Sequence, residues 1–281
     1  MPISLFEHII RNIAPGLTEN VVPAPELRDM LPECFVARSD TFPRCGLAFN
    51  DAIPTAVFLQ NPCGTATFRS GERILTVTHA WVSGQYLENV AVELHNPGEK
   101  MLVVRFNPVY FNQFSVTPAR DLRNRLAWDL QAVFGSRVNA WLSGLEKQTD
   151  LMARVRTLES FLKSLGTHRE TANHLLLDAV QKIVARKGHI QIEPLAASLN
   201  VGYKWLERSF MRATGVSPKE FARQQRFIHT YFDVVNRPEM DLPEIALRNA
   251  YYDQNHLSKE FKKFTGCSPG RLRKHHSPCR N

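Results

Sequence analysis

The sequence predicts an α+β protein, with a small β-barrel or β-sandwich followed by helices and then an all-α region containing two helix-turn-helix units. Three observations support this fold class. Short runs rich in β-branched and aromatic residues occupy about residues 44–108, as strands do. After Pro118 the apolar residues recur at a helical period, and a helix-turn-helix pattern occurs twice in the last third of the chain. With 281 residues, 43% of them hydrophobic, the chain can form two ordinary cores.

The first part is predicted to consist of short strands. The runs TAVFLQ, ILTVTHAWV, VAVEL and MLVVRFN favour strands, and the turn signals NPCG and HNPGEK divide them. Such spacing is typical of a sandwich or a small barrel. In ILTVTHAWV one face would carry Leu75, Val77, His79 and Trp81, which indicates an interior lining with one polar group. No second His or Glu lies near His79 at metal-ligand spacing, so neither a metal nor a cofactor is expected.

Three amphipathic helices are predicted over about residues 119–165, in ARDLRNRLAWDLQAVFG, SRVNAWLSGLEKQ and DLMARVRTLESFLKSLG. Leu151, Val155, Leu158 and Leu162 form the clearest apolar stripe. This stripe would pack on the strands, while the rest of the helix could pair with a second copy of the chain in a homodimer. The predicted domains are therefore residues 1–165 and 178–281, joined by a polar linker at 166–177.

The last third contains an internal repeat. Its two copies are LAASLNVGYKWLERSFMRATGVSP and IALRNAYYDQNHLSKEFKKFTGCSP. From the second helix of each copy onward, they align at an offset of 51 residues. One extra residue in the turn of the second copy accounts for the smaller offset before that turn. Each copy is predicted to contain a short helix, a tight turn and a longer helix closed by glycine and Ser-Pro. In the longer helices, Leu206 and Phe210 match Leu257 and Phe261 as the buried pair.

All of the net positive charge lies in this repeated region. Residues 178–281 contain 18 Lys+Arg and 10 Asp+Glu, whereas residues 1–177 contain 17 of each. Concentrated basicity indicates a polyanion partner, either nucleic acid or an anionic membrane surface. Two helix-turn-helix units in the same region favour duplex DNA.

In duplex DNA, the second helix of each unit would enter the major groove. An α-helix is about 10–12 Å across and fits this groove, where residues near its N-terminus reach base edges. Lys204 and Arg208 suit guanine acceptors, and Asn255 can bond to adenine through both amide groups. Cations further along each helix would contact phosphate. The predicted DNA-binding residues are Tyr203, Lys204, Trp205, Arg208, Arg212, Gln254, Asn255, His256, Lys259, Lys262 and Lys263.

The segment IALRNAYYDQNHLSKEFKKFTGCSPGRLRK, residues 245–274, resembles the C-terminal signature of the AraC/XylS family of bacterial transcription regulators. It departs from the family pattern at Ala250, Asn255, Leu257 and Leu272, where that pattern has Gly, commonly Ser, Phe and an aromatic residue. Ala250 lacks the turn freedom of glycine. The other departures bear on sequence preference and leave the fold prediction unchanged.

This resemblance, which covers about residues 180–276, implies a function as well as a fold. It implies two helix-turn-helix subdomains joined by a long helix at about 218–235, entering successive major-groove segments of double-stranded DNA. The N-terminal part resembles, less specifically, the cupin-like sensor domains of this family, including AWVSGQ and VVRFNPVYFNQFSV. A small-molecule effector is expected there, with no effector-binding residue identified. RNA polymerase and a second copy of the chain are further candidate partners.

Other functions are less well supported by the sequence. An enzyme would need a metal triad or a nucleophile with its base, and Ser70, Ser83 and His95 have no such context. A ligand-independent DNA-binding regulator, whose N-terminal part serves only dimerisation or protein contact, remains open. The five cysteines are odd in number and widely spaced, which indicates reduced thiols. A redox or metal-sensing role for Cys34, Cys45 and Cys63 is the alternative.

No membrane partner is expected. The sequence has no apolar run near the roughly 18–20 residues that span a bilayer. MPISLFEHIIRN also lacks the basic region, long apolar segment and cleavage site of a secretory signal. The predicted location is the cytoplasm.

Overall fold

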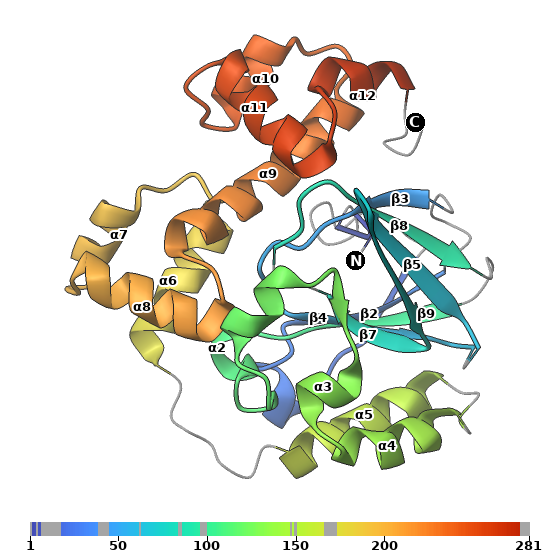
Figure 1. Ribbon diagram of the computed structural model, residues 1–281. Helices are drawn as coiled ribbons and strands as arrows, with labels where there is room; N and C mark the ends of the chain where they lie inside the picture. Colours follow the sequence, from blue (N-terminus) through green and yellow to red (C-terminus); the bar gives the residue numbers. More distant parts are fainter. Residues whose placement is uncertain are drawn as a thin grey trace.

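A computed structural model describes residues 2–3, 5–6, 18–38, 45–61, 63–83, 86–95, 100–146, 148, 151–165 and 173–275. Its N-terminal part consists of two antiparallel β-sheets, with strand orders β1-β2-β9-β4-β7-β10 and β3-β8-β5-β6 (Figure 1). The strands are β1 (Thr18–Asn20), β2 (Glu33–Arg38), β3 (Cys45–Ala48), β4 (Thr55–Leu59), β5 (Thr65–Ser70), β6 (Arg73–Thr78), β7 (Ala80–Ser83), β8 (Val90–His95), β9 (Lys100–Arg105) and β10 (Ala127–Trp128).

Strands β2 to β9 have the connectivity of a jelly roll. The row β2-β9-β4-β7 lies in one sheet and the row β3-β8-β5-β6 in the other, which is the double-sheet arrangement also found in cupins. The longest pairing joins β2 and β9, from Glu33 opposite Arg105 to Arg38 opposite Lys100. The predicted α+β class and cupin-like resemblance are confirmed, and of the two predicted forms the structure adopts the sandwich.

The run ILTVTHAWV, predicted as one strand, forms two strands in different sheets. His79 separates β6 from β7 and has a left-handed φ of 62°. This backbone bend lets the chain cross from one sheet to the other. Leu75 and Val77 still pack against the interior cluster, and Trp81 is fully buried within it.

Helices follow the sandwich, but the first predicted one is interrupted. After α2 (Pro108–Phe111), ARDLRNRLAWDLQAVFG forms a 3₁₀ helix η3 (Ala119–Asn124), strand β10 and helix α3 (Leu130–Phe134). Strand β10 pairs with β7, and the Asp129 side chain caps α3 by accepting a hydrogen bond from the Gln131 N–H. The prediction of a continuous helix was therefore wrong, because pairing at the sheet edge outweighed the helical period.

The other two predicted helices are confirmed as α4 (Arg137–Glu146) and α5 (Leu151–Leu165). Val155, Leu158 and Leu162 are buried in an apolar cluster with the outer face of the larger sheet. The stripe of α5 therefore packs on the strands, as the first of the two predicted arrangements required.

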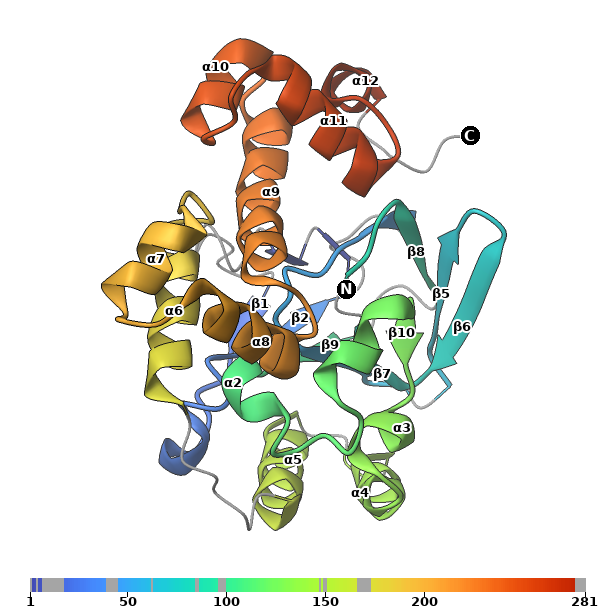
Figure 2. The ribbon, with the colours of Figure 1, turned by 60° about the vertical axis from the view of Figure 1, so that its left-hand side comes forward.

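The C-terminal helices are α6 (His174–Ala185), α7 (Ile192–Ser198), α8 (Tyr203–Thr214), α9 (Pro218–Asn236), α10 (Leu242–Arg248), α11 (Gln254–Thr265) and α12 (Pro269–His275). Helix α9 joins the unit containing α6–α8 to the unit containing α10–α12, and the sandwich lies beside it (Figures 1 and 2). Residues 166–172 of the predicted linker lie outside the described residues, while 174–177 belong to α6. No helix within the described ranges is long and apolar enough to cross a bilayer.

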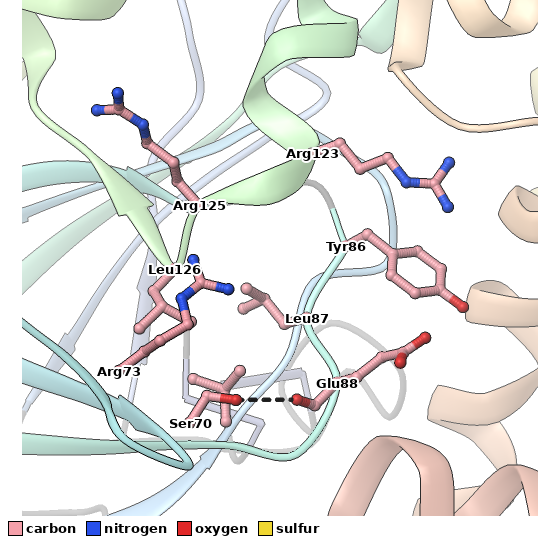
Figure 3. A pocket seen from close by; sticks show the side chains of 9 residues that line it. Ser70, Arg73, Tyr86, Leu87, Glu88, Arg123, Arg125 and Leu126 are labelled. Atoms are coloured by element: carbon pink, nitrogen blue, oxygen red, sulfur yellow. Dashed lines mark hydrogen bonds between the residues drawn. The ribbon is translucent and has the colours of Figure 1, made fainter.

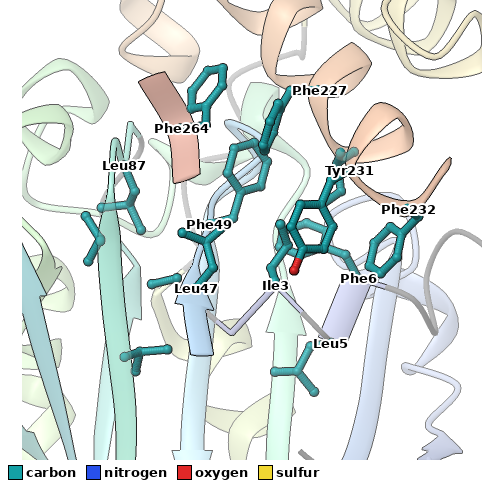
Figure 4. Packing of buried hydrophobic residues seen from close by; sticks show 14 of the residues in the cluster. Ile3, Leu5, Phe6, Leu47, Phe49, Leu87, Phe227, Tyr231, Phe232 and Phe264 are labelled. Atoms are coloured by element: carbon teal, nitrogen blue, oxygen red, sulfur yellow. The ribbon is translucent and has the colours of Figure 1, made fainter. Parts of the chain in front are cut away.

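One apolar cluster continues from the interior of the sandwich into the C-terminal helices. Phe49, at the end of β3, lies 5.1 Å from Phe227 of α9 and 5.5 Å from Phe264 of α11, measured between ring centroids. Phe227 and Phe264 are themselves 4.5 Å apart. Figure 4 shows these rings facing one another between the strand and the helices. The two predicted domains therefore share part of their core.

Candidate nucleic-acid interface

The two helix-turn-helix units have the same local structure. Helices α8 and α11 each end at a left-handed glycine, Gly215 with φ 74° and Gly266 with φ 77°. In the turns that precede them, Asn200 and Ala250 both have φ 54°. A left-handed backbone costs about 1–2 kcal/mol for an ordinary side chain, and asparagine tolerates it better than alanine. The turn around Ala250 is thus strained at the position where the family pattern has glycine.

Helix α8 buries one face and exposes the face predicted to contact bases. Leu206 and Phe210 are fully buried within the unit that contains α6–α8, called the first unit below. In contrast, Lys204, Arg208 and Arg212 are exposed. The apolar pair and the cations lie on opposite faces of the helix, as expected for an amphipathic helix.

The two aromatic residues predicted at the start of α8 are half-buried. Tyr203 and Trp205 pack against the apolar cluster of the first unit. The Lys219 ammonium lies over the Tyr203 ring at 5.4 Å. Their rings thus support the helix as well as bordering its exposed face.

Helix α11 exposes all six of its predicted DNA-binding residues. They are Gln254, Asn255, His256, Lys259, Lys262 and Lys263. The helix begins at an Asp253 cap, whose carboxylate accepts a hydrogen bond from the His256 N–H at 2.7 Å. Asn255 therefore lies in the first turn, where side chains reach base edges when such a helix enters the major groove.

A buried network orients α11 on α9, and no sequence motif indicated it. Glu260 accepts hydrogen bonds from Arg226 at 2.9 Å and from the Tyr251 hydroxyl at 2.6 Å. The Arg226 guanidinium also lies 4.2 Å from the centre of the Tyr251 ring. Burial disfavours the charged form of Arg226, but the Glu260 carboxylate outweighs this and holds the Arg226 pKa above its usual value.

Tyr252 is a further candidate contact that the sequence prediction omitted. It is 89% exposed and lies directly before the α11 cap, whereas its neighbour Tyr251 is buried. The family pattern could have indicated this difference. Its aromatic position is occupied by Tyr251, which leaves Tyr252 outside the core.

The sandwich contacts both ends of the helix-turn-helix region. The segment Tyr86–Val90, called loop 86–90 below, packs against α11: Glu88 forms a salt bridge to Lys263 at 2.9 Å, and the Asn89 N–H donates to the Phe264 carbonyl at 2.9 Å. At the other unit, the Asn112 side chain donates to the Arg212 carbonyl at 2.9 Å. Lys263, predicted to contact phosphate, is therefore paired with a sandwich residue in this structure.

Helix α9 is docked on the sandwich by buried polar contacts. The Gln224 and Gln225 amides donate to the backbone carbonyls of Asn50 and Asp51 at 2.8 and 2.7 Å. The Asp51 carboxylate in turn accepts two hydrogen bonds from the buried Arg105, at 3.2 and 2.7 Å. The contact thus runs from the middle of α9 into the sandwich interior.

The N-terminus of α9 is held by a second ion pair. Glu220 completes a capping box with Ser217 and accepts two hydrogen bonds from Arg123, at 3.0 and 2.5 Å. Burial acts to raise the Glu220 pKa, but the bonds from Arg123 and Ser217 lower it to about 2. The ionised carboxylate is therefore strongly favoured in the folded protein.

Glu220→Gln should lower stability at neutral pH by on the order of 2 kcal/mol, with the loss disappearing in acid. The folded-state pKa of Glu220, about 2, lies below its ordinary value of 4.5. Its contribution is consequently present above pH 4.5 and is lost as the pH falls toward 2. Urea unfolding of both proteins between pH 7 and pH 3 would measure the difference.

The difference in the free energy of unfolding between wild type and Glu220→Gln, taken at each pH, cancels the pH dependence that other groups contribute to both proteins. His229 is one of these, because burial and nearby Lys187 and His189 lower its pKa to about 4. A stability difference between wild type and Glu220→Gln that stayed constant down to pH 3 would contradict the assignment.

A cavity of about 590 Å³ opens beside this contact (Figure 3). Three arginines and an apolar floor line it, and this site is called the arginine pocket: Arg73, Arg123, Arg125, Leu87, Val90 and Leu126. Loop 86–90 supplies one wall. Figure 3 shows the Arg73 guanidinium between Leu87 and Leu126, and that of Arg123 directed toward the Tyr86 side.

The cysteines do not form a recognisable redox or metal site among the described residues. Burial, with a smaller effect of Glu159, raises the Cys34 pKa to about 12, so this thiol stays protonated and unreactive. Cys45 is half-buried and Cys63 is exposed. In the described part of the chain, no three His, Cys, Asp or Glu side chains are grouped as metal ligands.

Comparison with known proteins gives a match in the region of these two units. A family described as helix-turn-helix domain matches residues 195–275. The Msm operon regulatory protein of Streptococcus mutans is 25% identical over 119 residues, which are 42% of this chain and 42% of that protein. The alignment thus covers less than half of either sequence.

The solved structures that align with this chain are more distant in sequence. ToxT from Vibrio cholerae aligns with a TM-score of 0.44 and 11% identity, over 86% of this chain and 97% of its own. The AraC-like transcriptional activator CuxR aligns with a TM-score of 0.27 and 13% identity, over 77% of this chain and 88% of its own.

Proposed function

We propose that this chain, whose residues 195–275 match a helix-turn-helix domain family, is a sequence-specific DNA-binding regulator of transcription of the AraC type. The observation that carries this proposal is the repeated exposed face. Helices α8 and α11 present Lys204 and Arg208, and Asn255 and Lys259, at equivalent positions of two units. Helix α9, with 19 residues, spans about 28 Å at 1.5 Å per residue, which suits two units on one side of a duplex.

The sandwich would act as the sensor part of this regulator, controlled by a small-molecule effector. Its contacts with α9 and α11 support this role, because a change in the sandwich can alter the placement of both DNA-binding helices. RNA polymerase and a second copy of the chain are proposed as additional partners.

A ligand-independent regulator is the alternative, favoured by the filled interior of the sandwich. Phe68 and Trp81 are fully buried there, with ring centroids 5.9 Å apart. Thermal-shift screening would separate the two functions, because a ligand that binds only the folded protein raises its melting temperature. Among the described residues, the arginine pocket offers space for a ligand, as does a second cavity of about 370 Å³ beside α9.

Selection of bound fragments from genomic DNA, followed by titration at several salt concentrations, tests the proposed function. A DNA-binding protein of this type should enrich one sequence pattern. Its affinity should fall with salt at a logarithmic slope of about −0.9 per phosphate contacted. No enriched sequence, together with a nearly flat salt dependence, would contradict it.

Asn255→Ala should weaken binding to the selected DNA by about 1–3 kcal/mol, or roughly 5-fold to 150-fold, and leave binding to random DNA nearly unchanged. The physical reason is that an amide can donate to and accept from one adenine edge. Gel-shift titration on both DNAs measures the effect.

Lys262→Ala is the matched variant on the same helix. This residue is exposed two turns further on, and a phosphate contact there should weaken binding to both DNAs alike and reduce the salt slope by about one. Lys263 is less suitable because it also pairs with Glu88. Equal losses for Asn255→Ala on both DNAs would assign Asn255 to the backbone or to the helix end instead.

A further inference from the structure

We propose that the cavity of about 370 Å³ beside α9, called the inter-unit cleft below, binds the DNA backbone between the two recognition helices α8 and α11. Gln191 and Lys219 would contact phosphates that border the minor groove. This inference rests on the proposed function, since it adds a third area of contact with the same duplex. Neither residue is among the DNA-binding residues predicted from the sequence.

The inter-unit cleft extends between the first turns of the two recognition helices. His256, in the first turn of α11, lines it. Lys219, at the start of α9, lines it too. The Lys219 ammonium also lies over the ring of Tyr203, the first residue of α8, at 5.4 Å. Gln191 adds to the lining from the turn before α7. The cleft therefore connects the two helix ends that are proposed to reach base edges.

The geometry of B-DNA determines what this surface would meet. Two major-groove segments on one face of a duplex are one helical turn apart, about 34–36 Å. Helix α9, with 19 residues, separates the two units by a length of this order, about 28 Å. Between the two segments the minor groove faces the protein, and it is only about 6 Å wide. The surface between α8 and α11 would consequently lie against two closely spaced phosphate backbones.

Two side chains of the cleft are available to a phosphate. The Gln191 side chain is exposed and makes no capping hydrogen bond to α7. Lys219 pairs with Glu193 at 3.0 Å, but 59% of the lysine side chain and 61% of the glutamate side chain are exposed. An exposed ion pair contributes little to stability, so a phosphate oxygen can replace Glu193. Amide and ammonium groups are common phosphate contacts in protein–DNA complexes.

The two arginines of the cleft have partners within the protein. Arg223 donates to the Tyr86 hydroxyl, and Arg226 donates to Glu260 at 2.9 Å. Both arginines are half-buried, and Glu260 is buried. These contacts support the wall of the cleft and leave phosphate binding to the two exposed side chains.

Titration of the full chain with selected and random DNA at several salt concentrations tests the two contacts. Lys219→Ala should weaken binding to both DNAs about tenfold and reduce the logarithmic salt slope by about one. Gln191→Ala should also weaken both about tenfold, but it should leave the salt slope unchanged, because an amide displaces no counterion. Wild-type affinity in both variants would overturn the proposal.

Glu193→Gln should have the opposite effect. It releases Lys219 and removes a carboxylate that would lie beside phosphate, so binding to both DNAs should tighten by about twofold to fivefold. The gain should disappear when Lys219→Ala is added, since the released ammonium is then absent. Unchanged or weaker binding in Glu193→Gln would overturn the role of Lys219.

Lys182→Ala is the matched control. Lys182 of α6 also pairs with a carboxylate, Asp178 at 3.3 Å, and 40% of its side chain is exposed, but it does not line the cleft. This variant should bind DNA within about twofold of the wild type. A loss equal to that of Lys219→Ala would overturn the site, because any surface lysine of the first unit would then have the same effect.

Ethylation interference locates the contact on the selected DNA. Ethylation of phosphates between the two major-groove segments should inhibit binding of the wild type and inhibit binding of Lys219→Ala much less. No interference between the segments would overturn the assignment of the cleft to the backbone. If the wild type bound no DNA, the proposed function would fail together with this site. If it bound DNA and the cleft variants matched it, only this site would fail.

Discussion

Phe227→Ala is expected to lower the free energy of unfolding by about 3–5 kcal/mol, the usual effect of emptying a large aromatic site in a core. Phe227 is fully buried. Its ring lies near Phe49 of the sandwich and near Phe261 and Phe264 of α11. The substitution therefore removes contacts within the second unit and between that unit and the sandwich.

Urea denaturation followed by circular dichroism measures this loss. Leu247→Ala is the control, because Leu247 belongs to the same unit but is 73% exposed, and it should change stability by no more than about 0.5 kcal/mol. A loss for Phe227→Ala as small as that of the control would show that the shared cluster does not support the fold.

Asp51→Ala should be comparably destabilising, by about 3–5 kcal/mol, because it leaves a buried charge without its main partner. Arg105 is 1% exposed and Asp51 is 3% exposed. Burial acts to lower the Arg105 pKa, but the Asp51 and Glu33 carboxylates outweigh it, so the pKa stays above its ordinary value. With Asp51 absent, the carboxylate that Arg105 keeps as a partner among the described residues is Glu33, at 2.5 Å.

The double variant Arg105→Met with Asp51→Ala is the informative comparison. It removes the unpaired charge, so it should recover part of the stability that Asp51→Ala loses. Thermal and urea unfolding of the single and double variants would complete the cycle. Strictly additive losses would contradict the view that an uncompensated charge causes the effect.

The two helix-turn-helix units could be predicted from local patterns of amino acids. The repeat at an offset of 51 places Leu206 and Phe210 opposite Leu257 and Phe261, and the structure buries all four. The helical spacing of these apolar residues is a local pattern, because residues three or four positions apart share one face of a helix. The exposed faces with Lys204 and Asn255 follow from the same geometry, while their contact with DNA stays a prediction.

The strand-rich composition likewise determined the class of the N-terminal part but not all its elements. Alternating and β-branched runs predicted β4, β8 and β9, since these side chains suit a pleated, half-buried surface. The helical prediction over 119–135 was wrong because β10 gains its hydrogen bonds from β7, a strand distant in the sequence. A short segment cannot indicate whether such a partner is available.

The contacts between the N-terminal part and the C-terminal helices could not be predicted from the sequence. Glu88 reaches Lys263, Asp51 reaches Gln225 and Arg123 reaches Glu220, each across a long stretch of chain. In the sequence these residues resemble ordinary surface charges and amides, since nothing in a local pattern marks which distant group a side chain will contact. Packing of the jelly roll against α9 brings them together, and the free energy of these contacts depends on burial that exists only after the chain has folded.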